Sequence, residues 1–162
     1  MSVRTGLGVD SHAFAAADAG RALILGGVAI PHDRGLAGHS DADALTHAIV
    51  DALLGAAALG DIGQHFPDTD PRYKDADSLE LLRAAVALVR GRGLAIVHVD
   101  ATVMLERPKL APHRDAMRAA LAGALGVEAG QISVKATTGE GMGFVGRGEG
   151  VAVMAVATLT QG

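Results

Sequence analysis

The C-terminal segment 150–159 constrains the fold most strongly, because it is apolar at both sets of alternating positions. A strand with apolar residues on both faces needs cover on both faces. Helices of the same chain can cover one face, and neighbouring subunits can cover the other. The segment therefore predicts an internal strand of a helix-backed sheet in an oligomeric protein.

Hydrophobic periodicity predicts the remaining elements. Alternation with a period of two is typical of a half-buried strand, and apolar residues at i, i+3, i+4 and i+7 are typical of an amphipathic helix. The other predicted strands are 3–9, 23–30 (interrupted by Gly26-Gly27), 95–106 and 131–137, and the predicted helices are 41–58, 78–92 and 112–125.

Helix-capping residues and long polar segments divide these elements. Ser40 with Asp43 three residues later resembles a capping box, so Ser40 is the predicted N-cap of helix 41–58. Asp77 is the predicted N-cap of the second helix. Segments 61–77 and 138–148 are expected to be loops, and structureless loops of such length are usually functional.

The order of elements predicts an α+β fold in one domain over residues 1–162. Helices are expected to cover one face of a mixed or antiparallel sheet. Strand 95–106 is apolar on one parity from Val97 to Leu105, which agrees with a helix-covered face.

Composition excludes several classes of protein. A formal net charge of −4 argues against a general nucleic-acid binder, and the absence of cysteine excludes thiolate metal ligands and a cysteine nucleophile. No apolar run reaches the roughly 20 residues that a membrane span needs, and no signal peptide is evident. We therefore expect a cytoplasmic protein without a membrane partner.

Two short segments offer ligands for a metal ion. Asp10 and His12 are two residues apart, so they leave the same face if the first strand extends that far. His47 falls near the start of the first helix, with Asp43 and Asp51 four residues away on either side, where either carboxylate could orient its imidazole. Three protein ligands leave one tetrahedral position open, as in catalytic zinc sites.

A wider set of motifs points to one family. The motifs are Gly8-Val9-Asp10-Ser11-His12, His39-Ser40-Asp41-Ala42-Asp43, residues 51–63, Phe66-Pro67-Asp68-Thr69-Asp70-Pro71, Pro108-Lys109, Lys135-Ala136-Thr137-Thr138 and residues 143–150. On these motifs the sequence resembles, over essentially its whole length, the 2-C-methyl-D-erythritol 2,4-cyclodiphosphate synthases of the non-mevalonate isoprenoid pathway.

The resemblance implies a metal-dependent phosphorus–oxygen lyase. The implied substrate is 4-diphosphocytidyl-2-C-methyl-D-erythritol 2-phosphate, whose 2-phosphate attacks the β-phosphorus to give the 2,4-cyclodiphosphate and CMP. The implied cofactors are a zinc ion (or manganese or cobalt in its place) and a magnesium or manganese ion at the diphosphate. The implied assembly is a homotrimer, with the three sheets packed around the trimer axis and active sites between subunits.

The resemblance also assigns roles to residues. Asp10, His12 and His47 would hold the zinc ion, and Glu140 the second metal. His39 and Thr138 would stabilise the transition state. The further substrate contacts would be Ser40, Asp61, Ile62, Gly63, Phe66, Pro67, Asp68, Thr69, Asp70, Leu105, Glu106, Arg107, Pro108, Lys109, Leu110, Ala111, Thr137, Gly139, Phe144 and Arg147, with residues 105–111 forming a cytosine pocket beside a neighbouring subunit.

Several alternatives stay open at this stage. Thr137 and Thr138 could simply fill a strand, Glu140 could be a solvated loop residue, and Arg147 could pair with Glu149 at a subunit contact. The sequence departs from the family at Gly141, where many members have lysine, and at Val9, where an aromatic residue is common.

Two other functions use the same residues. A zinc phosphoesterase would activate water in the open metal position, and a non-catalytic trimeric module would only bind an isoprenoid phosphate. Some members of the family are fused to a cytidylyltransferase, and from its length we expect this chain to be the single-function form.

Overall fold

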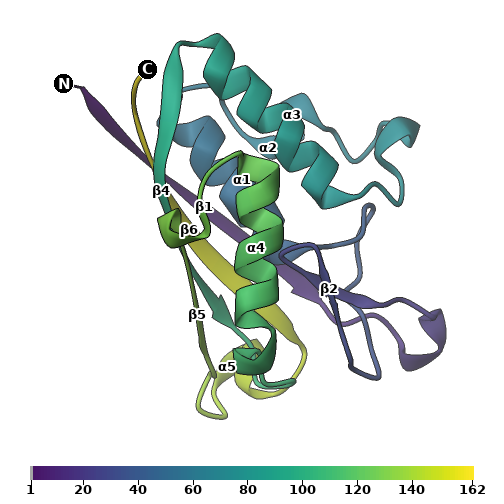
Figure 1. Ribbon diagram of the computed structural model, residues 1–162. Coiled ribbons are helices and arrows are strands. Elements are labelled where there is room, and N and C mark those ends of the chain that lie inside the picture. Colours follow the sequence, from purple (N-terminus) through teal and green to yellow (C-terminus); the bar gives the residue numbers. More distant parts are fainter. Residues whose placement is uncertain (1) are drawn as a thin grey trace.

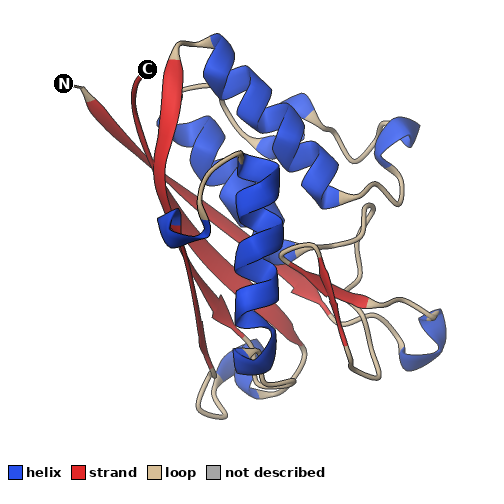
Figure 2. Ribbon diagram, viewed as in Figure 1, coloured by secondary structure: helices blue, strands red, loops and turns tan. Residues whose placement is uncertain are grey.

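The structure, a computed structural model, describes residues 2–162. A mixed sheet carries three longer helices on one side, with a small hairpin beside it (Figures 1 and 2). The strands are β1 Val3–Ala13, β2 Leu23–Leu25, β3 Val28–Ile30, β4 Leu94–Met104, β5 Ile132–Thr137 and β6 Gly150–Gln161. The helices are α1 Ala44–Ala56, α2 Ile62–His65, α3 Ser78–Gly91, α4 Arg114–Leu125 and α5 Gly143–Gly146.

The main sheet has the strand order β1-β6-β4-β5. β6 is antiparallel to both β1 and β4, whereas β4 and β5 are parallel. α1 packs against β1 and β6, and α3 and α4 pack against β4 and β5. The α+β class and the mixed, helix-covered sheet are confirmed.

Two glycines let α1 lie against β1 at backbone contact. A Cβ built on Gly8 would lie 1.8 Å from the carbonyl oxygen of Ala48, and one built on Gly6 would lie 2.1 Å from that of Ala52. No side chain fits at such distances, so glycine alone permits this approach. The close contact brings the first turn of α1, with His47, over the end of β1.

Substituting Gly8 with alanine is expected to lower the free energy of unfolding by about 1–3 kcal/mol or more, because the new methyl group meets backbone that cannot move aside. Urea denaturation measures the change. Gly123→Ala is the matched control: Gly123 is exposed in α4 with open space around it, so alanine there should raise stability by about 0.5–1 kcal/mol. Equal stability changes in the two variants would contradict the packing argument.

The start of α1 differs from the prediction. The N-cap is Asp43, whose side chain accepts from Thr46 N, so Ser40 is not the cap and the helix begins at Ala44 rather than 41. Asp43 is fully buried, and burial raises its pKa although four hydrogen bonds oppose that shift. Its two oxygens also accept from Gly26 N and Gly27 N, at 2.9 and 2.7 Å.

Those two glycines correct a second prediction. Residues 23–30 are not one interrupted strand but the hairpin β2–β3, which forms a separate two-stranded sheet. Gly26 and Gly27 have φ of 59° and 73°, the left-handed conformation that a two-residue hairpin turn of type I′ requires. The Asp43 carboxylate holds this turn against the start of α1.

The two predicted loops contain short helices. Asp61 caps α2 with Gln64 as its capping-box partner, and Asp70 caps the 3-10 turn Pro71–Tyr73. Segment 138–148 contains α5. Local side-chain-to-backbone bonds therefore order segment 61–77, and both segments contain helical turns where only loop was predicted.

One face of β6 lies open to solvent. Val151, Val153 and Ala155 are buried under the helices, whereas Met154 and Val156 on the other parity are 46% and 41% exposed. The helices therefore cover one face of the strand, and the cover expected for the other face would have to come from outside the single chain. Val97 is 42% exposed because a bulge between Ile96 and His98 breaks the alternation of β4.

No helix within residues 2–162 is long and apolar enough to cross a bilayer.

Candidate active site

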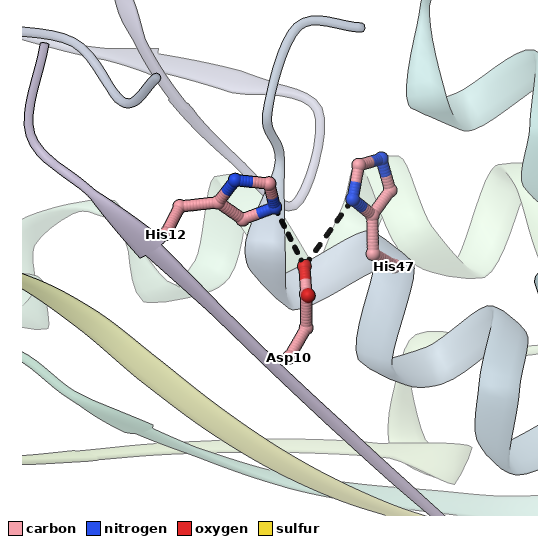
Figure 3. Close-up of side chains that lie close together, drawn as sticks. All are labelled: Asp10, His12 and His47. Atoms are coloured by element: carbon pink, nitrogen blue, oxygen red, sulfur yellow. Dashed lines mark hydrogen bonds and ion pairs between the residues drawn. The ribbon is translucent and has the colours of Figure 1, made fainter. Parts of the chain in front are cut away.

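Asp10, His12 and His47 converge at the contact between β1 and α1. β1 extends to Ala13, so Asp10 and His12 project from the same face of the strand, as the two-residue spacing predicts. One Asp10 oxygen, Oδ2, lies 2.9 Å from His12 Nε2 and 3.3 Å from His47 Nδ1 (Figure 3). One ligand atom from each residue lies within 4.8 Å of the other two, so the group could hold a metal ion.

The donor set suits zinc. It offers one carboxylate oxygen and two imidazole nitrogens, which are common zinc ligands, and leaves room for a further ligand. His12 Nδ1 lies 2.8 Å from the carbonyl oxygen of Ala37. Because a carbonyl only accepts, Nδ1 is the donor, and in the neutral ring the Nε2 lone pair faces the other ligands.

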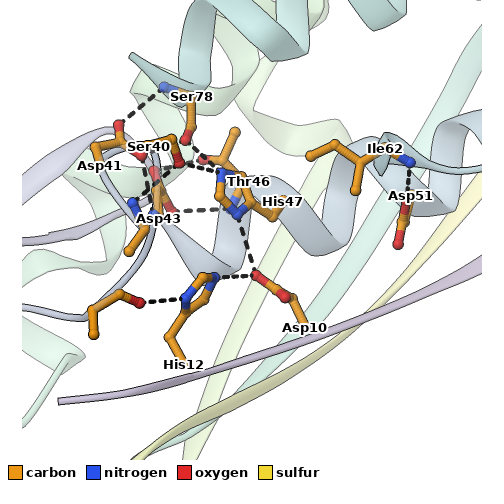
Figure 4. A network of polar contacts seen from close by, with 12 residues as sticks. Asp10, His12, Ser40, Asp41, Asp43, Thr46, His47, Asp51, Ile62 and Ser78 are labelled. Atoms are coloured by element: carbon orange, nitrogen blue, oxygen red, sulfur yellow. Dashed lines mark hydrogen bonds and ion pairs between the residues drawn. The ribbon is translucent and has the colours of Figure 1, made fainter. Parts of the chain in front are cut away.

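The groups that orient His47 are not the ones predicted. Its Nε2 lies 2.7 Å from Ser78 Oγ and 3.2 Å from Ser40 Oγ. Asp43 is the cap of α1, and Asp51 accepts instead from Ile62 N at 2.7 Å (Figure 4). Positions four residues apart share a helix face, but these two carboxylates find backbone donors, so neither reaches the ring.

The three side chains perturb one another's ionisation. Burial favours the neutral form of Asp10, but its hydrogen bonds to His12 and His47 outweigh this and lower the pKa of Asp10 to about 2. Burial also opposes charge on His12, but the hydrogen bond and charge of Asp10 raise the pKa of His12 above 6.5. Without a metal ion, the ionised Asp10 therefore favours the protonated form of His12.

These shifts predict how pH acts on the metal-free protein and on metal binding. The stabilisation from Asp10 is present above pH 3.8 and is lost as the pH falls through about 2. The stabilisation from His12 is present below pH 6.5 and is lost as the pH rises through the raised pKa of His12. Metal must displace the His12 proton, so zinc affinity should rise by up to about tenfold per pH unit across that titration.

Competition with a chelator of known affinity, from about pH 6 to pH 8, measures this dependence. The chelator's own protonation is corrected for with a metal titration in the absence of protein. A zinc affinity that stays constant over this range would contradict the proton displacement.

The metal-ligand group opens into a cavity of about 390 Å³. The structure brings together there the predicted residues Asp10, His12, His39, Ser40, His47, Ile62, Gly63, Phe66, Pro67 and Asp68. The rings of Phe66 and Tyr73 pack nearly edge to face in the cavity wall, with their centroids 5.6 Å apart. Gly38, Tyr73 and Leu81 also line the cavity and were not predicted.

Backbone carbonyls fix the segment that carries His39 and Ser40. His39 Nε2 lies 3.2 Å from the carbonyl oxygen of Asp70, so Asp70 enters the site through its backbone while its carboxylate binds Arg72. Arg21 donates to the carbonyl oxygens of Leu36 and Ser40, each at 2.7 Å. No sequence pattern points to Arg21, because its partners are backbone atoms brought near only by the fold.

A second cavity, of about 140 Å³, lies at the other group of predicted residues. Its predicted residues are Leu105, Glu106, Pro108, Lys109, Leu110, Ala111, Thr137 and Thr138, joined by Ala136 and Arg114. It shares no lining residue with the first cavity. Within one chain, the structure therefore does not bring Thr138 to the metal-ligand group.

The remaining predicted residues line neither cavity. Asp61 caps α2, Gly139 N donates to the Glu106 carboxylate, and Glu140 sits at a φ of 53° in the turn that follows. Arg147 pairs with Glu149 at 2.7 Å and lines a further cavity with Arg107. Phe144 is half-exposed, and Thr69 lies outside both cavities.

Comparisons with known proteins match nearly the whole length of this chain and agree on one family. A curated 2-C-methyl-D-erythritol 2,4-cyclodiphosphate synthase from Rubrobacter xylanophilus is 61% identical over 158 residues, which cover 98% of this chain and 95% of that protein. A solved structure of such a synthase in a CDP-bound form matches with a TM-score of 0.87 at 41% identity, over 97% of this chain and all of that one.

A bifunctional IspDF enzyme from Campylobacter jejuni matches with a TM-score of 0.94 and 44% identity over 99% of this chain, which spans 43% of that longer one. The model of the YgbB family matches residues 3–160. The chain therefore belongs to the YgbB family, that of the 2-C-methyl-D-erythritol 2,4-cyclodiphosphate synthases.

Proposed function

We propose that the protein converts 4-diphosphocytidyl-2-C-methyl-D-erythritol 2-phosphate to 2-C-methyl-D-erythritol 2,4-cyclodiphosphate and CMP. An oxygen of the 2-phosphate forms a bond to the β-phosphorus, and the bond from that phosphorus to the bridging oxygen breaks, so that the α-phosphate leaves as CMP. The observation that carries the proposal is the convergence of Asp10, His12 and His47 in the cavity of about 390 Å³, in a chain of this family.

The nucleophile belongs to the substrate, so the protein needs to align and neutralise phosphates rather than attack them. In this proposal Asp10, His12 and His47 hold a zinc-type ion, which when bound supplies positive charge at the β-phosphate. Glu140 would hold a magnesium- or manganese-type ion, since carboxylates are typical ligands of that ion, and the ion would supply further positive charge at the diphosphate. The pair of cations offsets the chain's net charge of −4.

The protein residues around the metal position hold the substrate. His39, oriented by the Asp70 carbonyl, and Ser40 face the cavity where the phosphates would lie. Ile62, Phe66 and Pro67 provide an apolar wall suited to the methylerythritol carbons. Backbone groups of residues 105–111 would bind the cytosine, and Thr137 and Thr138 the phosphates.

We propose further that the active site is completed between subunits of a homotrimer. The metal-ligand cavity and the Thr138 cavity share no residue within one chain, yet the reaction needs both groups on one substrate. The open face of the sheet presents exposed Leu7, Val9, Met154 and Val156, a surface that a trimer would cover. One domain over residues 1–162 carries the activity.

Sedimentation equilibrium at micromolar concentration is expected to give three times the monomer mass. Leu7→Glu should shift the protein to monomer and remove activity while zinc still binds, because Leu7 is 63% exposed on the open face and Asp10 points to the other. Ser2→Glu is the matched control, since Ser2 is exposed and precedes the strand. A wild-type monomer with full activity would contradict the shared site.

Product analysis tests the proposed reaction against its rivals. The purified protein is incubated with the substrate, zinc and magnesium, and the products are followed by ³¹P NMR. Cyclic diphosphate with an equal amount of CMP supports the synthase. An open-chain phosphate would identify a zinc phosphoesterase, and binding without turnover would identify a non-catalytic module.

A further inference from the structure

Ser78 connects the metal-ligand group to a carboxylate outside the cavity. It is the first residue of α3 and is fully buried. Its Oγ lies 2.7 Å from His47 Nε2 and donates to Asp41 Oδ1, while its backbone N donates to Asp41 Oδ2 at 2.9 Å (Figure 4). Asp41 therefore accepts hydrogen bonds from Ser78 through both of its carboxylate oxygens.

The direction of each hydrogen bond follows from the groups involved. An ionised carboxylate can only accept, so the single hydroxyl hydrogen of Ser78 is committed to Asp41. Ser78 Oγ can then only accept from His47, which requires the proton on Nε2. The other nitrogen, Nδ1, lies 3.3 Å from Asp10 Oδ2, and with Nε2 committed to Ser78 it is the nitrogen left to bind the metal ion, which would replace the bond to Asp10.

Ser40 does not impose this direction. Its Oγ lies 3.2 Å from His47 Nε2 and accepts from Ala42 N at 3.3 Å, so its own hydrogen stays free to point either way. Asp43 and Asp51, the carboxylates on the helix of His47, bond to backbone donors instead. Among the groups that reach the ring, only Ser78 has its hydrogen fixed by a carboxylate.

We infer that Ser78 and Asp41 are positioning residues that keep a proton on His47 Nε2 and so leave Nδ1 as the nitrogen that binds the metal ion. The inference rests on the proposed metal site and adds to it the residues that prepare one ligand before the ion arrives. A metal-bound histidine usually donates its other N–H to a carboxylate or carbonyl. Here a serine stands between the ring and the carboxylate.

Zinc affinity tests the inference independently of turnover. Ser78→Ala should raise the zinc dissociation constant by about 10–100-fold in chelator competition. Ser78→Thr keeps the hydroxyl and should restore affinity. Asp77→Ala is the matched control: Asp77 caps the same helix by accepting from Leu79 N but does not contact Ser78 Oγ, so it should lower the melting temperature without changing zinc affinity.

Asp41→Asn tests the direction of the bonds even if Ser78→Ala folds poorly. An asparagine NH₂ can donate to Ser78 Oγ and release the hydroxyl hydrogen toward His47 Nε2, which disfavours a proton on Nε2. Long-range ¹H–¹⁵N NMR of the metal-free protein should show a proton on His47 Nε2 in the wild type and the loss of that proton from Nε2 in Asp41→Asn. Zinc affinity should fall in this variant, and the Asp41→Asn change should have little further effect on affinity in a Ser78→Ala background.

Failure of this inference and failure of the metal site give different results. Wild-type protein that binds zinc, with zinc affinity and Nε2 protonation of His47 unchanged in both Ser78→Ala and Asp41→Asn, would overturn the positioning role alone. Wild-type protein that binds no zinc would overturn the metal site and the inference together.

Discussion

Replacing His47 with alanine is expected to abolish zinc binding and activity while the fold persists. Asp10 and His12 alone would leave two protein ligands, fewer than the three typical of catalytic zinc sites. Alanine is the best helix former, and the His47 side chain is 11% exposed at the rim of a cavity rather than inside the core. Zinc content after dialysis, far-UV circular dichroism and product formation measure the three consequences.

His98→Ala is the matched control for this experiment. His98 is exposed on β4, opposite Thr158, on the face of the sheet away from the helices, so its loss should leave zinc content unchanged. Near-stoichiometric zinc in purified His47→Ala would refute the assignment of the ligand. Unfolded His47→Ala would be uninformative about zinc, so His47→Gln, which keeps the side-chain volume closer, accompanies it.

The metal-ligand group could be predicted because its parts are local. A strand repeats every two residues, so Asp10 and His12 had to share a face once the strand reached them. The contact with His47 depends on Gly6 and Gly8, which let α1 approach β1. The glycines are plain in the sequence, but their partners in α1 are known only from the fold.

The groups that orient His47 could not be predicted in the same way. Helical spacing pointed to Asp43 and Asp51, but each carboxylate binds backbone N–H groups of a neighbouring segment. Ser78 lies 31 residues from His47 along the chain and reaches it only because α3 starts beside α1. Spacing within one helix carries no information about such a contact.

The hairpin at Gly26-Gly27 and the N-cap at Asp43 were also predicted incorrectly, and the two errors are connected. Two consecutive glycines between apolar triplets are typical of a type I′ turn, a signal the interpretation as one interrupted strand overlooked. The local pattern could not decide between Ser40 and Asp43 as the N-cap of α1, because serine and aspartate are both good N-cap residues. The bond from Asp43 to the hairpin turn decides the matter, and that bond is tertiary.

β6 is apolar on both of its faces, yet one of these faces is open in the single chain. Cover for Met154 and Val156 would have to come from outside the single chain. The same limit applies to the two cavities, since residues 105–111 and 137–138 gather at one site and the metal ligands at another. A sequence pattern can require that a face be buried without stating which molecule buries it.

Thr138→Val is expected to lower kcat by about 10²–10³-fold with little change in KM. Thr138 Oγ1 accepts from Glu140 N at 3.2 Å, so its hydrogen remains available to a phosphate oxygen. In the proposed reaction negative charge gathers on the oxygens of the β-phosphorus, and a donor aimed there helps most in the transition state. Thr138→Ser keeps the hydroxyl and should retain most of the activity.

Glu140→Gln should fail for a different reason, and the two variants are best compared in one metal titration. The amide weakens the second metal site, so raising magnesium or manganese should recover part of the lost activity, whereas Thr138→Val should show no recovery. Glutamine has nearly the same shape as glutamate, so Glu140→Gln should leave the turn, where residue 140 has a φ of 53°, as it is in the wild type. If both variants respond to metal alike, the separation of roles is wrong. If both keep full activity, segment 138–148 is structural, and the phosphate contacts must come from elsewhere.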